Sequence, residues 1–271
     1  MEGSLKRVAT GAVLIPIIVA IVLYAGPYWI LAVSAVIAVL AFSEFNALAR
    51  VDARDRVLDW LGIVSGLIII LAEYYLGPVF LAPALLAFVF LFFFYSMVSG
   101  RTIGDSSIDT AHKTLGLLYI ALPISFITPL RELPQGQWWL LFLLVVVWAN
   151  DTFALSVGKT LGKHKLSPEI SPKKTVEGAV GGIIGGIIAA FVFARLAGLG
   201  PDYLGITALS AGIGLIAIVG DLAESVLKRS AGVKDSGAII PGHGGMLDRI
   251  DSLIFNIPFV YFYLTFRAMH I

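Results

Sequence analysis

The residues that could do chemistry are concentrated near the C-terminus, where acidic and basic side chains alternate closely. If an apolar helix continues into this stretch, Asp221, Ser225 and Lys228 share one helical face. Asp248 and Asp251 likewise share a face at the start of the last helix. Carboxylates suit a hard cation such as Mg²⁺, and Lys and Arg suit phosphate oxygens. The pattern indicates a phosphate site, and the alternative is a solvated loop with incidental salt bridges.

Two further groups of polar residues lie earlier in the chain. Asn150 and Asp151 end an intensely apolar run, and an acidic residue at membrane depth is costly and by default functional. The alternative is an interfacial Asp that ends a span and pairs with a nearby Lys. Lys173 and Lys174 follow two Ser-Pro pairs and precede a helix start, whose free N–H groups would add to a phosphate contact. Their alternative role is that of a positively charged topology anchor.

Four glycines line one face of the apolar run that follows these lysines. Gly181 and Gly182 are repeated four positions later by Gly185 and Gly186, which is the small-residue spacing of closely packed membrane helices. No Gly-Lys-Ser/Thr ending follows, which excludes a phosphate-binding loop. We therefore expect these glycines to serve helix packing.

The composition of the chain limits the class of protein to which it can belong. Of 271 residues, 58% are apolar and 14% are charged, and the mean hydropathy is +0.92. Soluble domains are about 45–50% apolar and about 25% charged, so a water-soluble or disordered chain is excluded. The net charge of +1 favours no nucleic-acid role. The absence of cysteine excludes disulfides, thiolate metal sites and a cysteine nucleophile.

The apolar runs predict an all-α polytopic membrane protein with nine transmembrane helices, because irregular backbone cannot face lipid. Residues 1–137 are expected to form five N-terminal spans, the first of them retained rather than cleaved. Residues 138–271 are expected to form the catalytic region, with polar connections at 158–177 and 221–251. The predicted spans are Val8–Ala25, Pro27–Phe42, Val57–Tyr75, Val79–Met97, Leu115–Leu130, Trp138–Val157, Gly178–Ala197, Leu204–Gly220 and Ser252–Met269.

The basic residues set the orientation of these spans. With nine spans, 16 of the 19 Lys and Arg residues fall on one side of the membrane. The positive-inside rule then puts the N-terminus in the cytoplasm and the C-terminus outside. The 16 are Lys6, Arg7, Arg50, Arg54, Arg56, Arg101, Lys113, Lys159, Lys163, Lys165, Lys173, Lys174, Lys228, Arg229, Lys234 and Arg249, and the other three are Arg131, Arg195 and Arg267.

The polar residues of the C-terminal half, from about Trp148 to Phe255, resemble a known family. They are similar to the signature of bacterial phosphatidate cytidylyltransferases (CDP-diacylglycerol synthases). Leu155 departs from the tyrosine expected in many bacterial members. The matching residues are Ser225-x-x-Lys228-Arg229-x4-Lys234-Asp235, then Pro241-x-His243-Gly244-Gly245-x-x-Asp248-Arg249-x-Asp251, and, earlier, Asp151, Gly158-Lys159, Gly162-Lys163-x-x-Leu166 and Ser171-Pro172-x-Lys174-Thr175-x-Glu177-Gly178.

The resemblance implies a reaction in which the phosphate of phosphatidic acid attacks the α-phosphorus of CTP, giving CDP-diacylglycerol and pyrophosphate for phospholipid biosynthesis. It implies Mg²⁺ or Mn²⁺ as cofactor and a bacterial cytoplasmic (inner) membrane protein whose site faces the cytoplasm. The expected catalytic residues are Lys228, Arg229, Lys234, Asp235, His243 and Arg249. The expected substrate- and phosphate-binding residues are Asn150, Asp151, Lys159, Lys173, Lys174, Thr175, Glu177, Glu224 and Ser225. The expected metal ligands are Asp221 and Asp248, with Asp251 as a third candidate.

Two other readings of the sequence stay open. A membrane cytidylyltransferase or kinase could share the phosphate site and act on another lipid phosphate or on an isoprenoid. A transporter of anionic substrates is the more distant alternative, because such proteins place their charges in two repeated halves and no internal repeat is evident here. The sequence allows a homodimer without specifying one.

The charge asymmetry generates a topology prediction. In a chain without cysteine, a single Cys introduced near Lys163 should be labelled by an impermeant thiol reagent only after the cells are opened. Labelling from outside intact cells would contradict nine spans with a cytoplasmic N-terminus.

Overall fold

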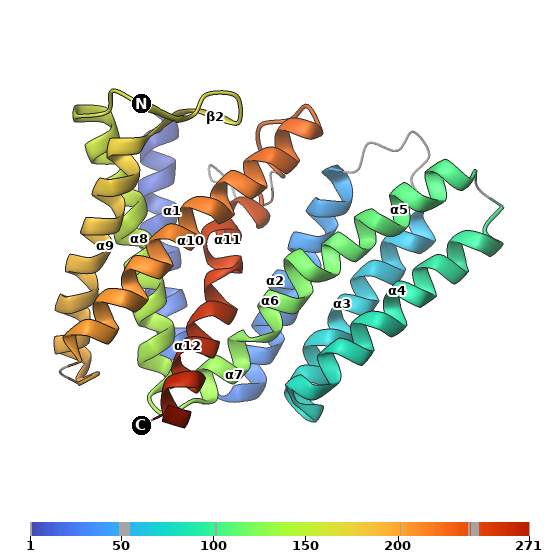
Figure 1. The fold of residues 1–271 in the computed structure, drawn as a ribbon, viewed down its shortest axis with the longest axis horizontal. Helices are drawn as coiled ribbons and strands as arrows, with labels where there is room; N and C mark the ends of the chain where they lie inside the picture. The colour runs from blue at the N-terminus through green and yellow to red at the C-terminus, as the bar shows by residue number, and fades with distance from the viewer. Residues whose placement is uncertain are drawn as a thin grey trace. The chain divides into compact units, whose positions relative to one another are not determined.

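The computed structural model describes residues 2–48, 55–100, 102–200, 202–237, 239 and 244–270, with backbone alone for 2–10 and 270 (Figure 1). Within these ranges, eight helices are long and apolar enough to cross a membrane. A shorter apolar segment, Gly11–Tyr24, belongs to α1 (Glu2–Tyr24) and corresponds to the first predicted span. The predicted all-helical architecture is confirmed, and the protein is an integral membrane protein.

The chain forms two compact units, which are described separately. Unit 1 comprises Met1–Thr10, Gly26–Pro129 and Asp235–Arg249. Unit 2 comprises Gly11–Ala25, Leu130–Lys234 and Ile250–Ile271. These two units are defined by how the helices pack. The predicted division after residue 137 instead separates the N-terminal spans from the expected catalytic region, and it stays a prediction.

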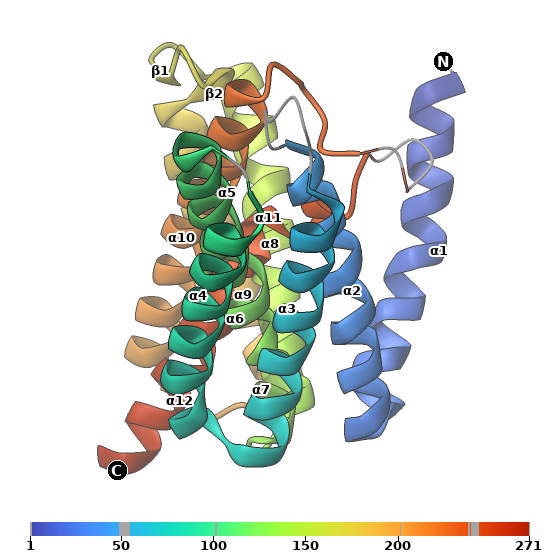
Figure 2. The ribbon, with the colours of Figure 1, turned by 90° about the vertical axis from the view of Figure 1, so that its right-hand side faces the viewer.

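Unit 1 is built mainly from α2 to α5, which lie side by side in both ribbon views (Figures 1 and 2). The fifth span is irregular, because Pro123 lacks an N–H group and a π-helical turn precedes it. The elements are α2 (Pro27–Leu48), α3 (Arg56–Leu76), the short η1 (Pro78–Phe80), α4 (Leu81–Val98), α5 (Ile103–Gly116), η2 (Leu117–Ala121), α6 (Leu122–Ser125) and the start of α7 (Ile127–Glu132).

Unit 2 contains the apolar part of α1 (Gly11–Tyr24), the end of α7, a small hairpin and the later helices of the chain. The hairpin strands lie at one end of α8 and α9 (Figures 1 and 2). The last span is broken at Phe255, three residues before Pro258, and α11, its first half, begins in unit 1. The elements are α8 (Gly136–Thr160), β1 (Lys165–Ser167), β2 (Ser171–Thr175), α9 (Val176–Ala197), α10 (Tyr203–Ser230), α11 (Leu247–Ile254) and α12 (Asn256–His270).

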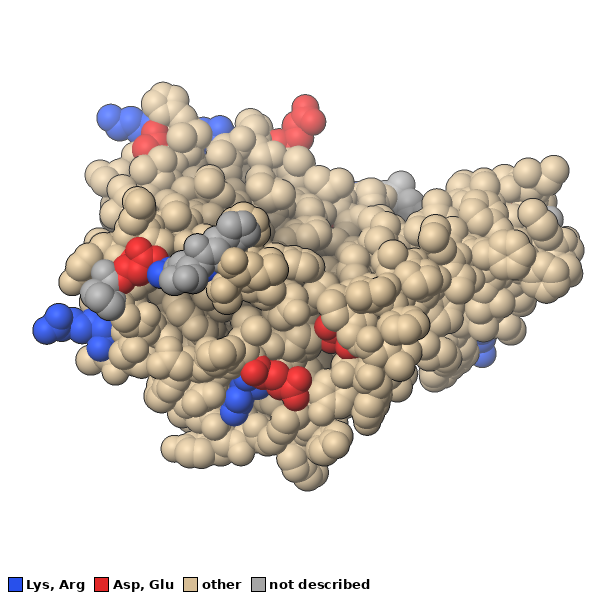
Figure 3. Space-filling model, turned by 60° about the horizontal axis from the view of Figure 1, so that its bottom comes forward, with Lys and Arg blue, Asp and Glu red and all other residues tan. Residues whose placement is uncertain are grey.

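The surface is dominated by uncharged residues, as a lipid environment requires. Figure 3 shows one face on which Lys, Arg, Asp and Glu form only small, separate groups. Large apolar side chains such as Phe90, Ile184 and Leu215 are exposed along the spans. In a bilayer these side chains contact acyl chains, so their exposure carries no penalty.

The glycine face of α9 packs against α8, as the sequence predicts. A Cβ atom on Gly181 would lie 2.6 Å from Val157, and one on Gly185 would overlap the ring of Phe153. Because lipid gives helices no hydrophobic drive to associate, close backbone approach of this kind is a principal source of their packing energy.

This packing generates a stability prediction. Gly185→Ala should lower the free energy of unfolding by about 1–3 kcal/mol, because Phe153 must move to admit the methyl group. The matched control is Gly104→Ala on α5, where a Cβ meets nothing within 4 Å and the helix should be slightly stabilised. Thermal unfolding in detergent measures both, and a Gly185→Ala midpoint at or above that of the control would contradict the close packing.

Candidate active site

A cavity of about 550 Å³ lies in unit 2, at the end of α8, α9 and α10 that carries the hairpin. Its wall combines basic and acidic side chains with small apolar ones. Seven of the predicted site residues line it: Asn150, Asp151, Lys159, Lys173, Lys174, Thr175 and Asp221. Residues of α8, of the hairpin with the start of α9, and of α10 therefore meet in one cavity.

The hairpin supplies most of the positive charge of this cavity. Strands β1 and β2 pair antiparallel, with Lys165 opposite Thr175. Lys173 precedes Thr175 by two positions and so extends from the same face of the strand. Sequence reasoning missed Lys165 as a site residue, and the signal that could have found it is its place within the motif that contains Lys163 and Leu166.

Asp221 is the acidic group opposite these lysines. Helix α10 continues through it to Ser230, which confirms that Asp221, Ser225 and Lys228 share one helical face. The Asp221 carboxylate pairs with Lys174 Nζ at 2.6 Å, and the Ser225 hydroxyl lies 3.5 Å from Asp221 Oδ1. The ion pair joins β2 to α10 and fixes one side of the cavity.

A second carboxylate approaches Asp221 because Gly220 has no side chain. A Cβ atom on Gly220 would overlap the backbone carbonyl of Asp251, so only glycine lets α10 and the end of α11 meet this closely. Asp251 interacts electrostatically with Asp221, Asp151 and Lys228. Among the described residues, no group of three or more His, Asp or Glu side chains is arranged to hold a metal ion.

The connection that leads into the hairpin is held by the first turn of α9. Glu177 accepts hydrogen bonds from the backbone N–H groups of Lys163 (3.0 Å) and His164 (3.2 Å), and its carboxylate also contacts the His164 ring. Thr175 caps the helix by accepting from Gly178 N–H at 3.1 Å. In this arrangement Glu177 contacts protein groups, and its predicted contact with substrate stays a prediction.

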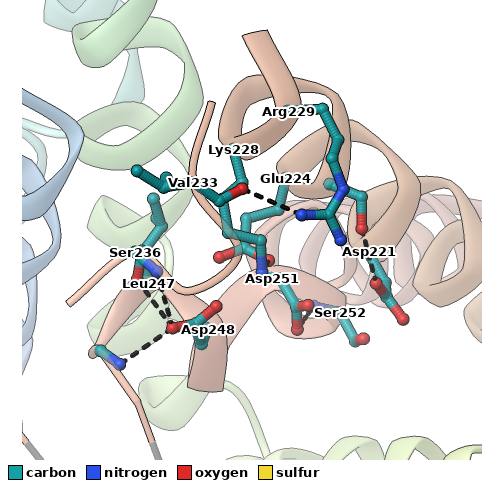
Figure 4. A network of polar contacts seen from close by, with 12 residues as sticks. Asp221, Glu224, Lys228, Arg229, Val233, Ser236, Leu247, Asp248, Asp251 and Ser252 are labelled. Carbon is teal, nitrogen blue, oxygen red and sulfur yellow. Dashed lines mark hydrogen bonds and ion pairs between the residues drawn. The ribbon is translucent and has the colours of Figure 1, made fainter. Parts of the chain in front are cut away.

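Two basic residues near the end of α10 have protein partners (Figure 4). Lys228 is buried and pairs at 2.5 Å with Glu224, whose side chain is 0% exposed. Arg229 is exposed and donates to the Val233 carbonyl at 2.9 Å. The pairing holds Lys228 in a fixed position, while Arg229 keeps donors that face solvent.

Asp248 belongs to unit 1, where it organises the loop before α11. Its Oδ2 atom accepts from Ser236 N–H, Ser236 Oγ and Gly245 N–H at 2.9–3.0 Å (Figure 4). Asp221 belongs to unit 2, so the predicted pairing of these two carboxylates on a metal stays a prediction.

Four predicted catalytic residues follow α10 in the sequence. Lys234, Asp235 and Arg249 are exposed. His243 lies outside the described residues.

Asn150 is the most enclosed polar residue of the cavity wall. It is 2% exposed, and its Oδ1 atom has no hydrogen-bond partner in the described part of the chain. Cβ atoms on Gly182 and Gly214 would lie 2.9 and 3.2 Å from this oxygen, so it is enclosed between α8, α9 and α10.

The fold and the site define a class: an integral membrane protein that collects lysines and carboxylates at one end of its helices. Across residues 5–267 the chain matches the model of the cytidylyltransferase family, and it belongs to that family. It is similar to phosphatidate cytidylyltransferases from Bacillus subtilis (strain 168), Staphylococcus aureus (strain COL) and Rickettsia felis. The first alignment is 41% identical and covers 56% of this chain and 57% of the relative. The others are 32% and 33% identical and cover 73% and 78% of this chain and 76% and 94% of the relatives.

Proposed function

We propose that the protein transfers the CMP group of CTP to phosphatidic acid, giving CDP-diacylglycerol and pyrophosphate. The observation that carries the proposal is the cavity that Lys159, Lys165, Lys173 and Lys174 line together with Asp221, in a member of the cytidylyltransferase family. The relatives named phosphatidate cytidylyltransferase support the choice of lipid substrate.

The reaction needs positioning and charge neutralisation more than nucleophile activation. The attacking group is a phosphate oxygen that is already anionic, so no serine or cysteine nucleophile and no general base is required. As its bond to the α-phosphorus forms, the bond from that phosphorus to the β-phosphate oxygen breaks and pyrophosphate leaves. The lysines of the cavity hold the two like-charged reactants together and offset the charge on the departing pyrophosphate.

Lys174 and Lys228 have distinct parts in this proposal. Lys174 is anchored by Asp221, so its ammonium group is held at the cavity wall instead of sampling solvent. Lys228 is oriented by Glu224 from within α10. Arg229 offers a planar fork for two phosphate oxygens, which lysine cannot reproduce.

The carboxylates fit a divalent cation, Mg²⁺ or Mn²⁺. Asp221 and Asp251 repel each other across the Gly220 contact, and a cation between them would relieve that repulsion. Mg²⁺ is usually held by one or two carboxylates plus substrate phosphates, so a two-carboxylate site is sufficient. We propose Asp221 and Asp251, both of unit 2, as its ligands, and the role of Asp248 as a metal ligand stays a prediction from the sequence. When bound, the cation would polarise phosphate oxygens and offset their charge.

The location of the site follows from the distribution of charge. We propose that the protein lies in the bacterial cytoplasmic membrane, with the N-terminus and the lysine-lined cavity on the cytoplasmic side, where CTP is dissolved. The phosphate of a membrane lipid lies at the same interface, so both substrates reach the cavity without crossing the bilayer. A homodimer stays a prediction.

The activity generates the first prediction of this proposal. Purified protein in detergent or liposomes should convert CTP and phosphatidic acid to CDP-diacylglycerol when Mg²⁺ or Mn²⁺ is present and should lose turnover after EDTA treatment. Labelled CTP and a panel of lipid and isoprenoid phosphates provide the measurement. Full turnover after metal removal would contradict the metal requirement, and preference for another phosphate would contradict the lipid substrate.

The carboxylates generate a second prediction. Asp221→Asn and Asp248→Asn keep side-chain volume but remove charge, and each should lower turnover by at least about a hundredfold, the usual cost of losing a principal electrostatic stabiliser. Both variants should still insert into membranes and purify, because the apolar spans are unchanged. Glu169→Gln, an exposed position in the hairpin turn, is the matched control with expected full activity. Near-normal rates and Mg²⁺ dependence in both Asp variants would refute the site assignment.

A further inference from the structure

We propose that Glu44, on α2, is a positioning residue for the loop that carries Asp248. This inference rests on the proposed function in that the loop belongs to the motif of the transferase. It adds a residue from the N-terminal helices, outside the motif residues that the sequence analysis matched to the family.

The Glu44 carboxylate serves as an acceptor for three donors of this loop. Met246 N–H donates to Oε1 at 2.9 Å, and Leu247 N–H and the Ser236 hydroxyl lie 2.8 and 3.0 Å from Oε2. Glu44 is 5% exposed and lies about two hundred residues from its partners in sequence. A buried carboxylate is costly unless hydrogen bonds satisfy it, so the loop and Glu44 stabilise each other.

Two glycines let the loop close around this carboxylate. A Cβ atom on Gly237 would lie 2.6 Å from Glu44 Oε1, and one on Gly245 would overlap Glu44 Oε2. Both positions therefore require glycine for space, independently of backbone conformation. The loop is shaped to receive an acidic side chain from α2.

Ser236 connects Glu44 to Asp248. Its hydroxyl lies 3.0 Å from Glu44 Oε2 and 3.0 Å from Asp248 Oδ2, and its backbone N–H donates to the same Asp248 oxygen. The hydroxyl has one proton to donate, so the two carboxylates share it. Moving Glu44 would therefore move Ser236 and, through it, Asp248.

The end of α2 is itself held in place on both sides of Glu44. The Phe45 ring stacks on the ring of His112 with centroids 4.2 Å apart. Asn46 accepts from Lys113 Nζ at 2.7 Å, and Lys113 also pairs with Asp59 on α3. These contacts from α3 and α5 fix the backbone from which Glu44 extends, so the loop is attached to a rigid support.

The test compares Glu44→Gln and Glu44→Asp with wild type in the full-length protein. Gln keeps the volume but has one acceptor oxygen and adds an amide donor opposite the N–H groups of Met246 and Leu247. We expect hydrogen exchange at Gly245, Met246 and Leu247 to accelerate at least tenfold. We expect kcat to fall about tenfold or more while KM for CTP changes less than threefold. Glu44→Asp keeps the charge. Its kcat should therefore be higher, and its exchange at the three loop amides slower, than in Glu44→Gln.

Glu73→Gln is the matched control, because Glu73 is also a buried glutamate of unit 1 but lies near the end of α3 away from this loop's hydrogen bonds. It should leave kcat and exchange at the loop amides unchanged. Unaltered exchange at Gly245–Leu247 in Glu44→Gln, or a kcat within twofold of wild type, would overturn the proposal. If wild type itself lacks transferase activity, the proposed function fails, while the exchange comparison still decides whether Glu44 holds the loop.

Discussion

The constraint on which this structure depends is the cost of placing charge at the edge of a bilayer. An unpaired ionised side chain in a low-dielectric setting is strongly disfavoured, so charges there must be paired or exposed to water. Lys113 with Asp59, Lys228 with Glu224 and Lys174 with Asp221 each follow this rule. Such pairs add little net stability by themselves, since desolvation offsets much of the attraction. Their consequence is geometric: they fix ammonium and carboxylate groups at defined positions near the ends of the helices.

Glycine is the second determinant of the site, because two helix backbones can come into close contact where a glycine has no side chain. Gly181 and Gly185 bring α8 and α9 together, and the hairpin that joins these two helices is thereby held over the cavity. Gly220 does the same for α10 and α11, next to Asp221. Gly220 is followed directly by Asp221, so at this contact close packing and the placement of a polar side chain are required at adjacent positions.

Much of the fold could be predicted because its signals are local. The apolar runs, the charge-bearing gaps between them and the glycine spacing on α9 each depend on residues close together in sequence. The helical face that carries Asp221, Ser225 and Lys228 follows from periodicity alone, and α10 confirms it. The sequence predicted a polar connection at 158–177, but it did not specify the strand pairing within it, which depends on partners across the turn.

The contacts of the site could not be predicted in the same way, because they join distant segments. Glu44 reads in sequence as an acidic residue at the end of a span, and nothing near it indicates that Ser236 and Leu247 are its partners. Lys165 lies within the motif that contains Lys163 and Leu166, but its position opposite Thr175 depends on strand pairing. Periodicity specifies a face of one helix but not which other helix it meets.

The motif residues from Asp221 to Asp251 are divided between two packing units. The residues from Asp221 to Asp251 are continuous in sequence, yet the loop with Asp248 packs with α2 while Asp221 and Asp251 pack within the other unit. Helix α11 carries both Asp248 and Asp251, three positions apart, so the two carboxylates lie on one helical face. In the role that we propose for it, Glu44 holds the start of α11 through Met246 and Leu247, and Ser236 extends this network to Asp248.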